Sequence, residues 1–523
     1  MSTASPVPRP DHPSVLPFAV MCAGMFIALL DIQIVAASLQ DIGGGLSAGQ
    51  DQIGWLQTAY LIAEIIVIPM SGWLTRVFST RWLFVASALG FTAASALCGM
   101  AWNIESMIAF RALQGMLGAS MIPTVFTSTF HFFPGKRQPL AAAVVGTIAS
   151  VAPALGPMIG GWITDTLSWH WLFYINLVPG LLVAAGVAAW VDIDRPEPGL
   201  LKDADYLGIG LMAIFLGNLE YVLEEGARWN WFDDAGIRHS AWAAGVAGVL
   251  FVWRSLAYEH PIVELRALGN RNFLIGCILS FITGMGIFGT IYLIPLFLGY
   301  VRGLSAWQTG EILSATGLGS LLGVPCYIAL ARRGVDTRWL MAFGLAMFGL
   351  SMLSFSRITH DWGAGQLFWP QVIRGFPQVF AVAPAVTLGL GSLPMARLKY
   401  ASGLFNMMRN LGGAVGIAIC GAILNNRTNL HFERIAASLN AGHAPLGVVI
   451  AAMHARLQQV LGDDTRATAA SLAELRQLVY REASTMAYAD AFLVMLAAFA
   501  IAIVLVPLLR KVVQQGAGSA AGH

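Results

Sequence analysis

Three charged side chains stand inside long apolar stretches in the first quarter of the sequence: Asp31, Glu64 and Arg111. A charge within a membrane-type segment costs about 2.5–3.5 kcal/mol on insertion scales, so each one is expected to serve a purpose. Burial favours the protonated form of a carboxyl group, whereas a neighbouring guanidinium favours the carboxylate. A carboxyl that approaches and leaves Arg111 would therefore bind and release a proton. These residue types predict a proton-coupling site.

A structural role for the same residues is the alternative. Ion pairs between Arg111 and the carboxyls would hold helices together and stay neutralised permanently. The presence of two costly carboxyls favours proton binding by at least one of them. The sequence does not decide whether Asp31 or Glu64 titrates.

A later apolar stretch is rich in glycine and proline. Residues 152–161 read Ala-Pro-Ala-Leu-Gly-Pro-Met-Ile-Gly-Gly, so Pro153, Gly156, Pro157, Gly160 and Gly161 share one short segment. Glycines four residues apart let another helix approach closely, and prolines remove backbone donors and permit bending. The segment predicts tight helix packing, and we interpret it in addition as a hinge between moving parts.

The composition indicates whether the segments that carry these residues lie in water or in lipid. The 523-residue chain is 57% hydrophobic and only 11% charged, with a mean hydropathy of +0.68. Soluble domains are about a quarter charged, so most of this surface must face lipid. All five cysteines lie in apolar stretches without a CxxC pair, which favours small buried side chains over disulfides or metal ligands.

Apolar runs of roughly 20 residues, the length that crosses a bilayer, occur about fourteen times. We expect membrane helices near 17–39, 53–75, 82–101, 105–130, 139–164, 170–191, 207–225, 240–258, 272–300, 309–331, 338–356, 364–392, 401–425 and 488–510. Lys and Arg concentrate in alternate loops, such as those holding Arg76, Arg81, Arg332 and Arg333, which places both termini in the cytoplasm.

Two short repeats relate the halves of the chain. Gly45-Leu46-Ser47-Ala48 recurs as Gly303-Leu304-Ser305-Ala306, and Thr80-Arg81-Trp82-Leu83 recurs as Thr337-Arg338-Trp339-Leu340. Repeated halves with the same orientation are typical of transporters whose substrate site lies between them.

This repeat predicts the domain organisation. A cytoplasmic tail (1–16) precedes an N-terminal six-helix half (17–191), two inserted helices (207–258) and a C-terminal six-helix half (272–510), and a second cytoplasmic tail (511–523) follows. The C-terminal half includes a long periplasmic loop (426–487) with amphipathic helical spacing, either a solvated loop or a docking surface for a partner.

Four sequence motifs resemble the major facilitator superfamily and, within it, the fourteen-span drug:proton antiporters of the EmrB type. Leu30-Asp31 with Ile34-Val35 is similar to the first-helix signature of that family. Residues 109–115 resemble its R-x-x-Q-G motif, linked there to proton coupling, and 152–161 resemble its antiporter motif with Ala152 for the first glycine. Residues 169–176 are similar to the W-R-W-x-F-x-I-N stretch, with His170 for arginine.

The cytoplasmic gating loop departs from the family pattern G-x-L-A-D-R-x-G-x-[KR]. It runs from Gly72 to Arg81, with Arg76 in the acidic position and Ser79 in the glycine position. The acid-based conformational lock of the family is therefore in question here. Glu64 lies outside the shared motifs, so its role rests on its chemistry alone.

The resemblance implies an all-α membrane protein with the major facilitator fold, two six-helix halves plus two inserted helices. It implies proton-driven multidrug efflux across the bacterial inner membrane, with a periplasmic adaptor of the EmrA type and an outer-membrane channel as partners. No cofactor is expected, because a proton gradient would supply the energy. A dedicated exporter of one metabolite and a proton-coupled uptake symporter remain alternatives.

We expect a substrate cavity between the halves near mid-membrane, with apolar and aromatic walls that accept small amphipathic or apolar compounds. Its polar residues are predicted to be Gln33, Gln114, Asn406, Arg409 and Asn410, beside Asp31, Glu64 and Arg111. The sequence lacks a phosphate-binding loop, a G-x-S-x-G motif and a ligand-like cluster, which argues against ATP drive, an enzyme or a metal site. Nothing in it favours nucleic-acid binding.

Overall fold

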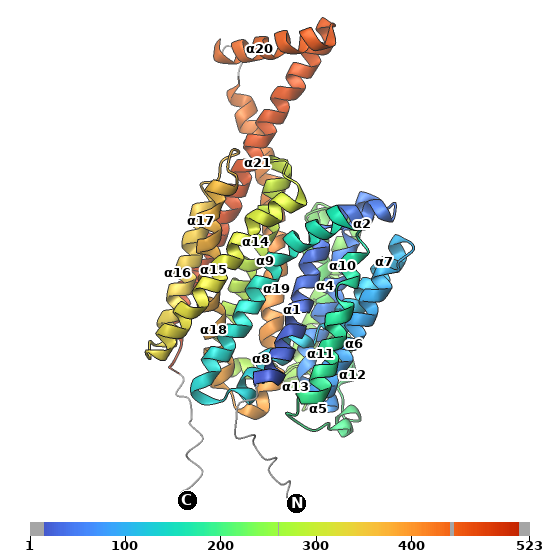
Figure 1. Ribbon diagram of the computed structural model, residues 1–523, viewed down its shortest axis with the longest axis vertical. Coiled ribbons are helices and arrows are strands. Elements are labelled where there is room, and N and C mark those ends of the chain that lie inside the picture. Colours follow the sequence, from blue (N-terminus) through green and yellow to red (C-terminus); the bar gives the residue numbers. More distant parts are fainter. Residues whose placement is uncertain (1–14, 260, 440–443, 512–523) are drawn as a thin grey trace, which may run out of the picture.

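The computed structural model describes residues 15–259, 261–439 and 444–511, which form a bundle of helices standing side by side (Figure 1). Thirteen helices among these residues are long and apolar enough to cross a membrane. A further passage is made by α7 (Ile104–Gly118) and α8 (Met121–Phe132) together. The expected all-α fold with about fourteen membrane helices is confirmed.

The fourth span was expected as one helix over 105–130, and it is interrupted at Ala119 and Ser120. Pro123 stands in the first turn of α8, where a missing backbone donor is tolerated. The interruption therefore lies where proline is easily accommodated.

The first half comprises α1 to α11. Its other helices are α1 (Val15–Ala37), α2 (Leu39–Gly45), α3 (Gln50–Ile53), α4 (Trp55–Val67), α5 (Ser71–Phe78), α6 (Thr80–Gly99), α9 (Gln138–Thr166), α10 (Trp171–Tyr174) and α11 (Leu177–Trp190). The second span is divided between α4 and α5 by the short helix η1 (Ile68–Met70), which contains Pro69.

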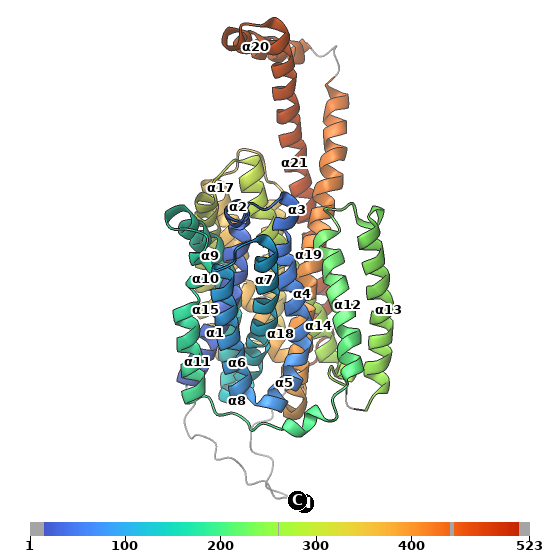
Figure 2. The ribbon, with the colours of Figure 1, turned by 90° about the vertical axis from the view of Figure 1, so that its right-hand side faces the viewer.

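The two inserted helices are α12 (Tyr206–Glu225) and α13 (Ala235–Ala257). They lie at one edge of the bundle, with α12 next to α4 and α13 outside it (Figure 2). The rings of Trp55 on α4 and Tyr221 on α12 are stacked with centroids 5.4 Å apart. The inserted pair is thus attached to the first half through α12.

The second half contains α14 (Arg271–Leu296), α15 (Ala306–Arg332), α16 (Thr337–Phe355), α17 (Ala364–Gly375), α18 (Gln378–Gly389), α19 (Met395–Ser438), α20 (Ala444–Leu461) and α21 (Asp464–Leu505). Polar caps fix several helix starts: Asn270 accepts a hydrogen bond from the Phe273 amide, and Ser305 accepts one from the Gln308 amide.

A helical hairpin projects from the periplasmic end of the bundle (Figures 1 and 2). The thirteenth and fourteenth spans were expected to end near 425 and to begin near 488. The helices themselves continue beyond these bounds, outside the bundle: α19 continues to Ser438, α21 begins at Asp464, and α20 crosses the tip. His431 of α19 lies 2.9 Å from Asp490 of α21, and Arg456 of α20 lies 2.6 Å from Glu474 of α21. The hairpin is an extension of two membrane helices.

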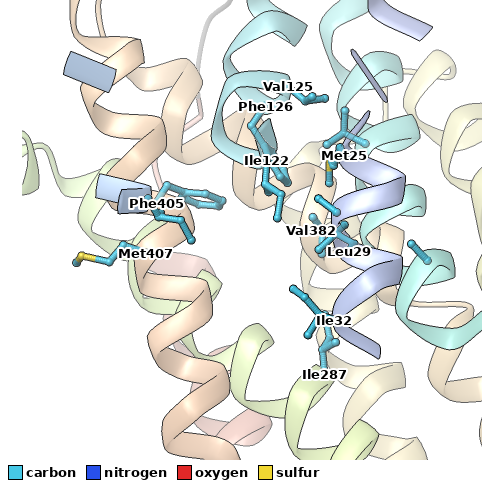
Figure 3. Close-up of a cluster of buried hydrophobic side chains, with 14 of the residues drawn as sticks. Met25, Leu29, Ile32, Ile122, Val125, Phe126, Ile287, Val382, Phe405 and Met407 are labelled. Atoms are coloured by element: carbon cyan, nitrogen blue, oxygen red, sulfur yellow. The ribbon is translucent and has the colours of Figure 1, made fainter. Parts of the chain in front are cut away.

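Buried apolar side chains from both halves meet near the centre of the bundle (Figure 3). Phe405 of α19 points towards Ile122 and Phe126 of α8, and Ile32 of α1 lies beside Ile287 of α14. The junction between the halves is therefore largely apolar, so the few polar groups around it stand out.

Candidate functional site

Asp31 is held by three donors from two other segments of the first half. Arg111 Nη1 donates to its Oδ2 at 2.8 Å, while Gln114 Nε2 and Asn176 Nδ2 donate to its Oδ1 at 3.1 and 2.6 Å. Arg111 and Gln114 are three residues apart on α7, so they share a helix face. The Asp31 carboxylate is fully buried and well satisfied.

Arg111 is equally buried and makes several further contacts. Its Nε donates to the Leu56 carbonyl at 3.2 Å, its Nη1 also donates to Gln114 Oε1 at 2.6 Å, and its guanidinium lies 4.3 Å from the Tyr60 ring centroid. These contacts bind α7 to α1 and α4. Because the ion pair has many partners, separating it would be costly.

Asn176, which lies just before α11, belongs to this group although sequence reasoning did not single it out. It donates to Asp31 and also to the Ser95 hydroxyl, at 3.0 Å. The sequence feature that could have identified Asn176 is its amide side chain inside an apolar stretch, at the end of the motif over 169–176. Gln114, predicted as a polar residue of the substrate cavity beside Asp31 and Arg111, is hydrogen-bonded to both of them.

Glu64 of α4 has a different environment. It is only 2% exposed, and its carboxyl makes no hydrogen bond or ion pair with any residue that the structure describes. It lies within electrostatic reach of Arg409 and of Arg111. The carboxyl of Glu64 could accept a proton without breaking an ion pair.

Arg409 comes from α19 and is thus a charge of the second half near the first. It is 5% exposed, and its guanidinium lies 5.0 Å from the ring centroid of Phe126 on α8. On the same helix, Asn406 is buried and donates to the Ser402 carbonyl at 2.9 Å, while Asn410 is half-buried. Glu64 of the first half and Arg409 of the second half therefore lie within electrostatic reach of each other across the junction of the halves.

The proline- and glycine-rich segment lies in α9, which continues unbroken through Pro153 and Pro157. A Cβ at Gly156 would lie 2.3 Å from the Cβ of Gln33, and one at Gly160 would lie 2.8 Å from the Ile34 carbonyl oxygen. Gln33 thus packs against α9. Gly161 accepts a hydrogen bond from Thr164 at its carbonyl, at 3.1 Å.

The second half approaches the same segment of α9. A Cβ at Gly310 of α15 would lie 2.4 Å from the Cα of Met158. The segment is therefore packed between α1 of its own half and α15 of the other half. Any movement between the halves must involve this contact.

The cytoplasmic ends of the halves are joined through Gly72 and Arg76. A Cβ at Gly72 would lie 2.4 Å from the Lys399 carbonyl oxygen, so α5 and α19 touch backbone to backbone. Arg76 donates to the Tyr400 hydroxyl at 2.8 Å and to Glu197 at 2.9 Å. The arginine in the usual acidic position thus bridges to the other half.

The acidic partners in these cytoplasmic contacts come from the segment after α11. Glu197 binds Arg76, and Asp194 binds Lys399 of the second half and the Thr80 amide. Arg81 contacts only first-half partners in the described structure, the Val191 carbonyl and Asp192. A buried hydroxyl pair, Thr127 and Ser402 at 2.5 Å, lies within the same interface.

Arg374 of α17 is the other buried arginine of the second half. It donates to the hydroxyls of Thr290 and Thr316, each at 2.7 Å. No carboxylate of the described chain pairs with it, unlike Arg111. The two halves are therefore chemically different, with the buried carboxyls near the junction supplied by the first half.

Comparisons with known proteins agree with this architecture. The model of the Major Facilitator Superfamily matches residues 21–417. The colistin resistance protein EmrB of Acinetobacter baumannii is 41% identical over 424 residues, which are 81% of this chain and 82% of that protein. The multidrug export protein EmrB of Escherichia coli strain K12 is 30% identical over 435 residues, 83% of this chain and 84% of that protein.

A solved structure shows the same fold at low sequence similarity. A bacterial homologue of the human lysosomal transporter Spinster, in an inward-facing state, matches with a TM-score of 0.54 and 15% identity over 96% of this chain and 98% of that chain. The family expected from the motifs is confirmed. The chain belongs to the major facilitator superfamily, as a multi-pass inner-membrane transporter of the EmrB type.

Proposed function

We propose that this transporter exports small amphipathic or apolar compounds, drugs or toxic metabolites among them, in exchange for protons. The carrying observation is the contrast between two buried carboxyls. Asp31 is held by three donors, whereas Glu64 has no hydrogen-bond partner in the described chain and faces Arg409. Glu64 is assigned as the proton-exchanging group, with the proton gradient as the energy source.

The position of Glu64 offers a way to couple proton binding to movement. As a carboxylate it attracts Arg409 of the second half, and as a neutral acid it does not. Protonation therefore weakens one attraction across the junction and changes the relative stability of the two conformations. A proton that binds one conformation better shifts the equilibrium towards it.

The cytoplasmic contacts fit alternating access. Substrate arriving from the cytoplasm would need the Gly72–Lys399 and Arg76–Tyr400 contacts to separate. The apolar side chains at the junction, Ile122, Phe126 and Phe405 among them, would then be exposed to apolar compounds (Figure 3). The names of two relatives, a colistin resistance protein and a multidrug export protein, support a toxic-compound exporter.

The hairpin of α19, α20 and α21 supports a role in a larger assembly. It extends beyond the membrane-spanning bundle (Figure 1). The tip helix α20 carries polar residues together with exposed apolar side chains, Val448 and Val460 among them. We assign it as the docking site for a periplasmic adaptor of the EmrA type, which would connect the transporter to an outer-membrane channel.

Dye transport in inside-out vesicles tests the proposed function. An acidic lumen should drive accumulation of an ethidium-like cation or an uncoupler-like acid, and collapse of the pH gradient should abolish it. Accumulation driven by an alkaline lumen would identify an uptake symporter. Inactivity towards the whole panel, with folded protein and an intact gradient, would contradict broad efflux and point to an exporter of one metabolite.

A further inference from the structure

The inserted helix α12 carries three carboxyls within its last two turns: Glu220, Glu224 and Glu225. Glu225 is at the periplasmic end and accepts hydrogen bonds from Thr58, Trp229 and Arg228, at 3.1, 3.2 and 3.4 Å. Glu220 lies deeper and is 3% exposed, and its Oε2 atom has no hydrogen-bond partner in the described chain. A buried carboxyl without a partner is costly in a helix at the edge of the bundle.

The packing of α12 on α4 fixes the depth of these groups. A Cβ at Gly217 would lie 3.3 Å from Ile66 and 3.6 Å from Ile62, so Gly217 is level with Glu64, which stands between them in sequence. Three residues further along, Glu220 is about 4.5 Å closer to the periplasm. Helical side chains tilt towards the N-terminus of their helix, which on α12 is the direction of greater depth.

Glu224 continues the same row outwards. It is one turn beyond Glu220, about 6 Å further along the helix, and residues four apart share a helix face. One oxygen of Glu224, Oε1, is also buried without a hydrogen-bond partner in the described chain. Glu220 interacts electrostatically with both Glu224 and Glu64. Glu224 and Glu220 thus form a row on one face of α12, and the inner member, Glu220, is within electrostatic reach of Glu64 on α4.

Few other charged or titratable groups face this row. Tyr292 of α14 lies within electrostatic reach of Glu224, and Arg409 of α19 interacts with Glu64. On α13, Arg238 binds the Phe232 and Asp233 carbonyls, His239 is exposed, and Arg254 pairs with Asp205 at the opposite end. At the periplasmic end, Arg228 pairs with Glu225 at 3.4 Å. Glu220 and Glu224 themselves form no ion pair with a residue that the structure describes.

We propose that Glu224 and Glu220 conduct protons from the periplasm to Glu64, so that the inserted helix provides a proton path beside the substrate route. This inference rests on the proposed exchange of protons at Glu64. A hydronium O–H bond would break as an O–H bond forms on Glu224. The proton would then pass through intervening water to Glu220 and to Glu64, and each donor would return to the carboxylate. No other reactant is consumed.

The test compares Glu220→Gln, Glu224→Gln, Glu64→Gln and Glu220→Asp in inside-out vesicles, whose lumen corresponds to the periplasm. Two rates are measured with one fluorescent dye: uptake driven by an acidic lumen, and exchange of labelled for unlabelled dye at equal pH. Asn218→Ala is the matched control, because Asn218 is on α12 and, among the described residues, donates to the Ile214 carbonyl of its own helix alone.

We expect both glutamine variants to slow gradient-driven uptake about tenfold or more, because a proton-transfer group is lost. Equal-pH exchange should stay within about twofold of wild type, since it needs no net proton movement along α12. Glu220→Asp should recover part of the uptake, and Asn218→Ala should behave as wild type. Luminal acidification should partly restore the slowed variants, because a higher proton concentration compensates for a slower path.

Contradictory results separate this inference from the proposed function. If Glu64→Gln abolishes uptake while Glu220→Gln and Glu224→Gln do not slow it, the path along α12 is refuted and exchange at Glu64 stands. If Glu220→Gln and Glu224→Gln lose exchange together with uptake, or if neither is folded by size-exclusion chromatography, the carboxyls are structural and the inference fails. If wild type shows no proton-dependent movement, the proposed function itself fails.

Discussion

Arg111 of α7 and Asp31 of α1 form an ion pair of 2.8 Å in which neither side chain is exposed. Gln114 and Asn176 complete the coordination of the aspartate, so the pair joins α1, α7 and the start of α11. Asp31 therefore has a structural role, because its partners hold these helices together. Glu64 is also buried and has no such partners in the described chain, and it is the group that we propose exchanges protons.

Replacing Asp31 should therefore destabilise the protein. Asp31→Asn leaves the Arg111 charge buried without its counter-ion, and breaking a buried pair costs about 3–5 kcal/mol. A lower melting temperature of the detergent-solubilised protein is the expected result. Glu64→Gln, which breaks no ion pair in the described structure, should melt close to wild type and serves as the matched control.

The double variant Asp31→Asn with Arg111→Gln sharpens this prediction. Removing both charges should recover part of the lost melting temperature, because the uncompensated cation is gone. A single Asp31→Asn variant that melts like wild type would contradict a structural pair and would return Asp31 to the list of proton-exchanging candidates.

Arg76→Ala should loosen the cytoplasmic gate, because it removes contacts with Tyr400 and Glu197. The measurement is the rate at which a maleimide modifies Ser402→Cys, a position buried against Thr127, in a variant lacking Cys326. We expect labelling to accelerate several-fold. A decrease of about 1.4 kcal/mol in the free energy of opening would accelerate it about tenfold.

Arg81→Ala is the control for the gate. Arg81 is also basic and cytoplasmic, yet its described contacts are with Val191 and Asp192 of its own half. Maleimide labelling of the Ser402→Cys variant should keep its original rate when Arg81→Ala is added. Equal acceleration by both arginine substitutions would show a general loosening, and the assignment of Arg76 as a bridge would be wrong.

Gly156→Ala should push α9 away from α1, since its Cβ would lie 2.3 Å from the Gln33 Cβ. Overpacking of this kind costs about 1–3 kcal/mol, which should appear as a lower melting temperature and slower dye transport. Gly317→Ala on α15 is the control, because its Cβ meets nothing within 4 Å. Indistinguishable behaviour of the two variants would rule out close α1–α9 packing as the reason for the glycine.

Removal of α20 should separate transport from assembly. A variant in which a short flexible linker replaces Ala444–Leu461 keeps the membrane helices of α19 and α21. Dye transport in vesicles should be unchanged, whereas resistance of intact cells should fall if the hairpin binds an adaptor. Full resistance without α20 would contradict the docking assignment.

The overall fold could be predicted from the sequence because each membrane helix needs a long apolar run. The irregularities could not be predicted as well. A break at Ala119 and Ser120 lies within continuous apolar sequence, and the extension of α19 to Ser438 follows from packing against α21 outside the membrane. Apolar length sets where a helix crosses the bilayer, and it does not set where that helix ends.

The site could be predicted in its residue types and not in its pairings. Asp31, Glu64 and Arg111 were conspicuous because charges are rare in apolar segments. Which carboxyl binds Arg111 depends on how α1, α4 and α7 rotate, and no spacing within one helix contains that information. Glu220 and Glu224 were missed because they lie near the predicted end of the span over 207–225. At such a position, a buried glutamate and a glutamate in water cannot be distinguished from the sequence.

We propose that Glu64 is the carboxyl that exchanges protons. Its most direct test is purified Glu64→Gln protein in proteoliposomes, with dye uptake driven by a pH gradient compared with dye exchange at equal pH. We predict that gradient-driven uptake falls at least about a hundredfold while exchange continues, because a permanently neutral side chain cannot couple the two movements. Gradient-driven uptake at the wild-type rate would show that a group other than Glu64 carries the proton.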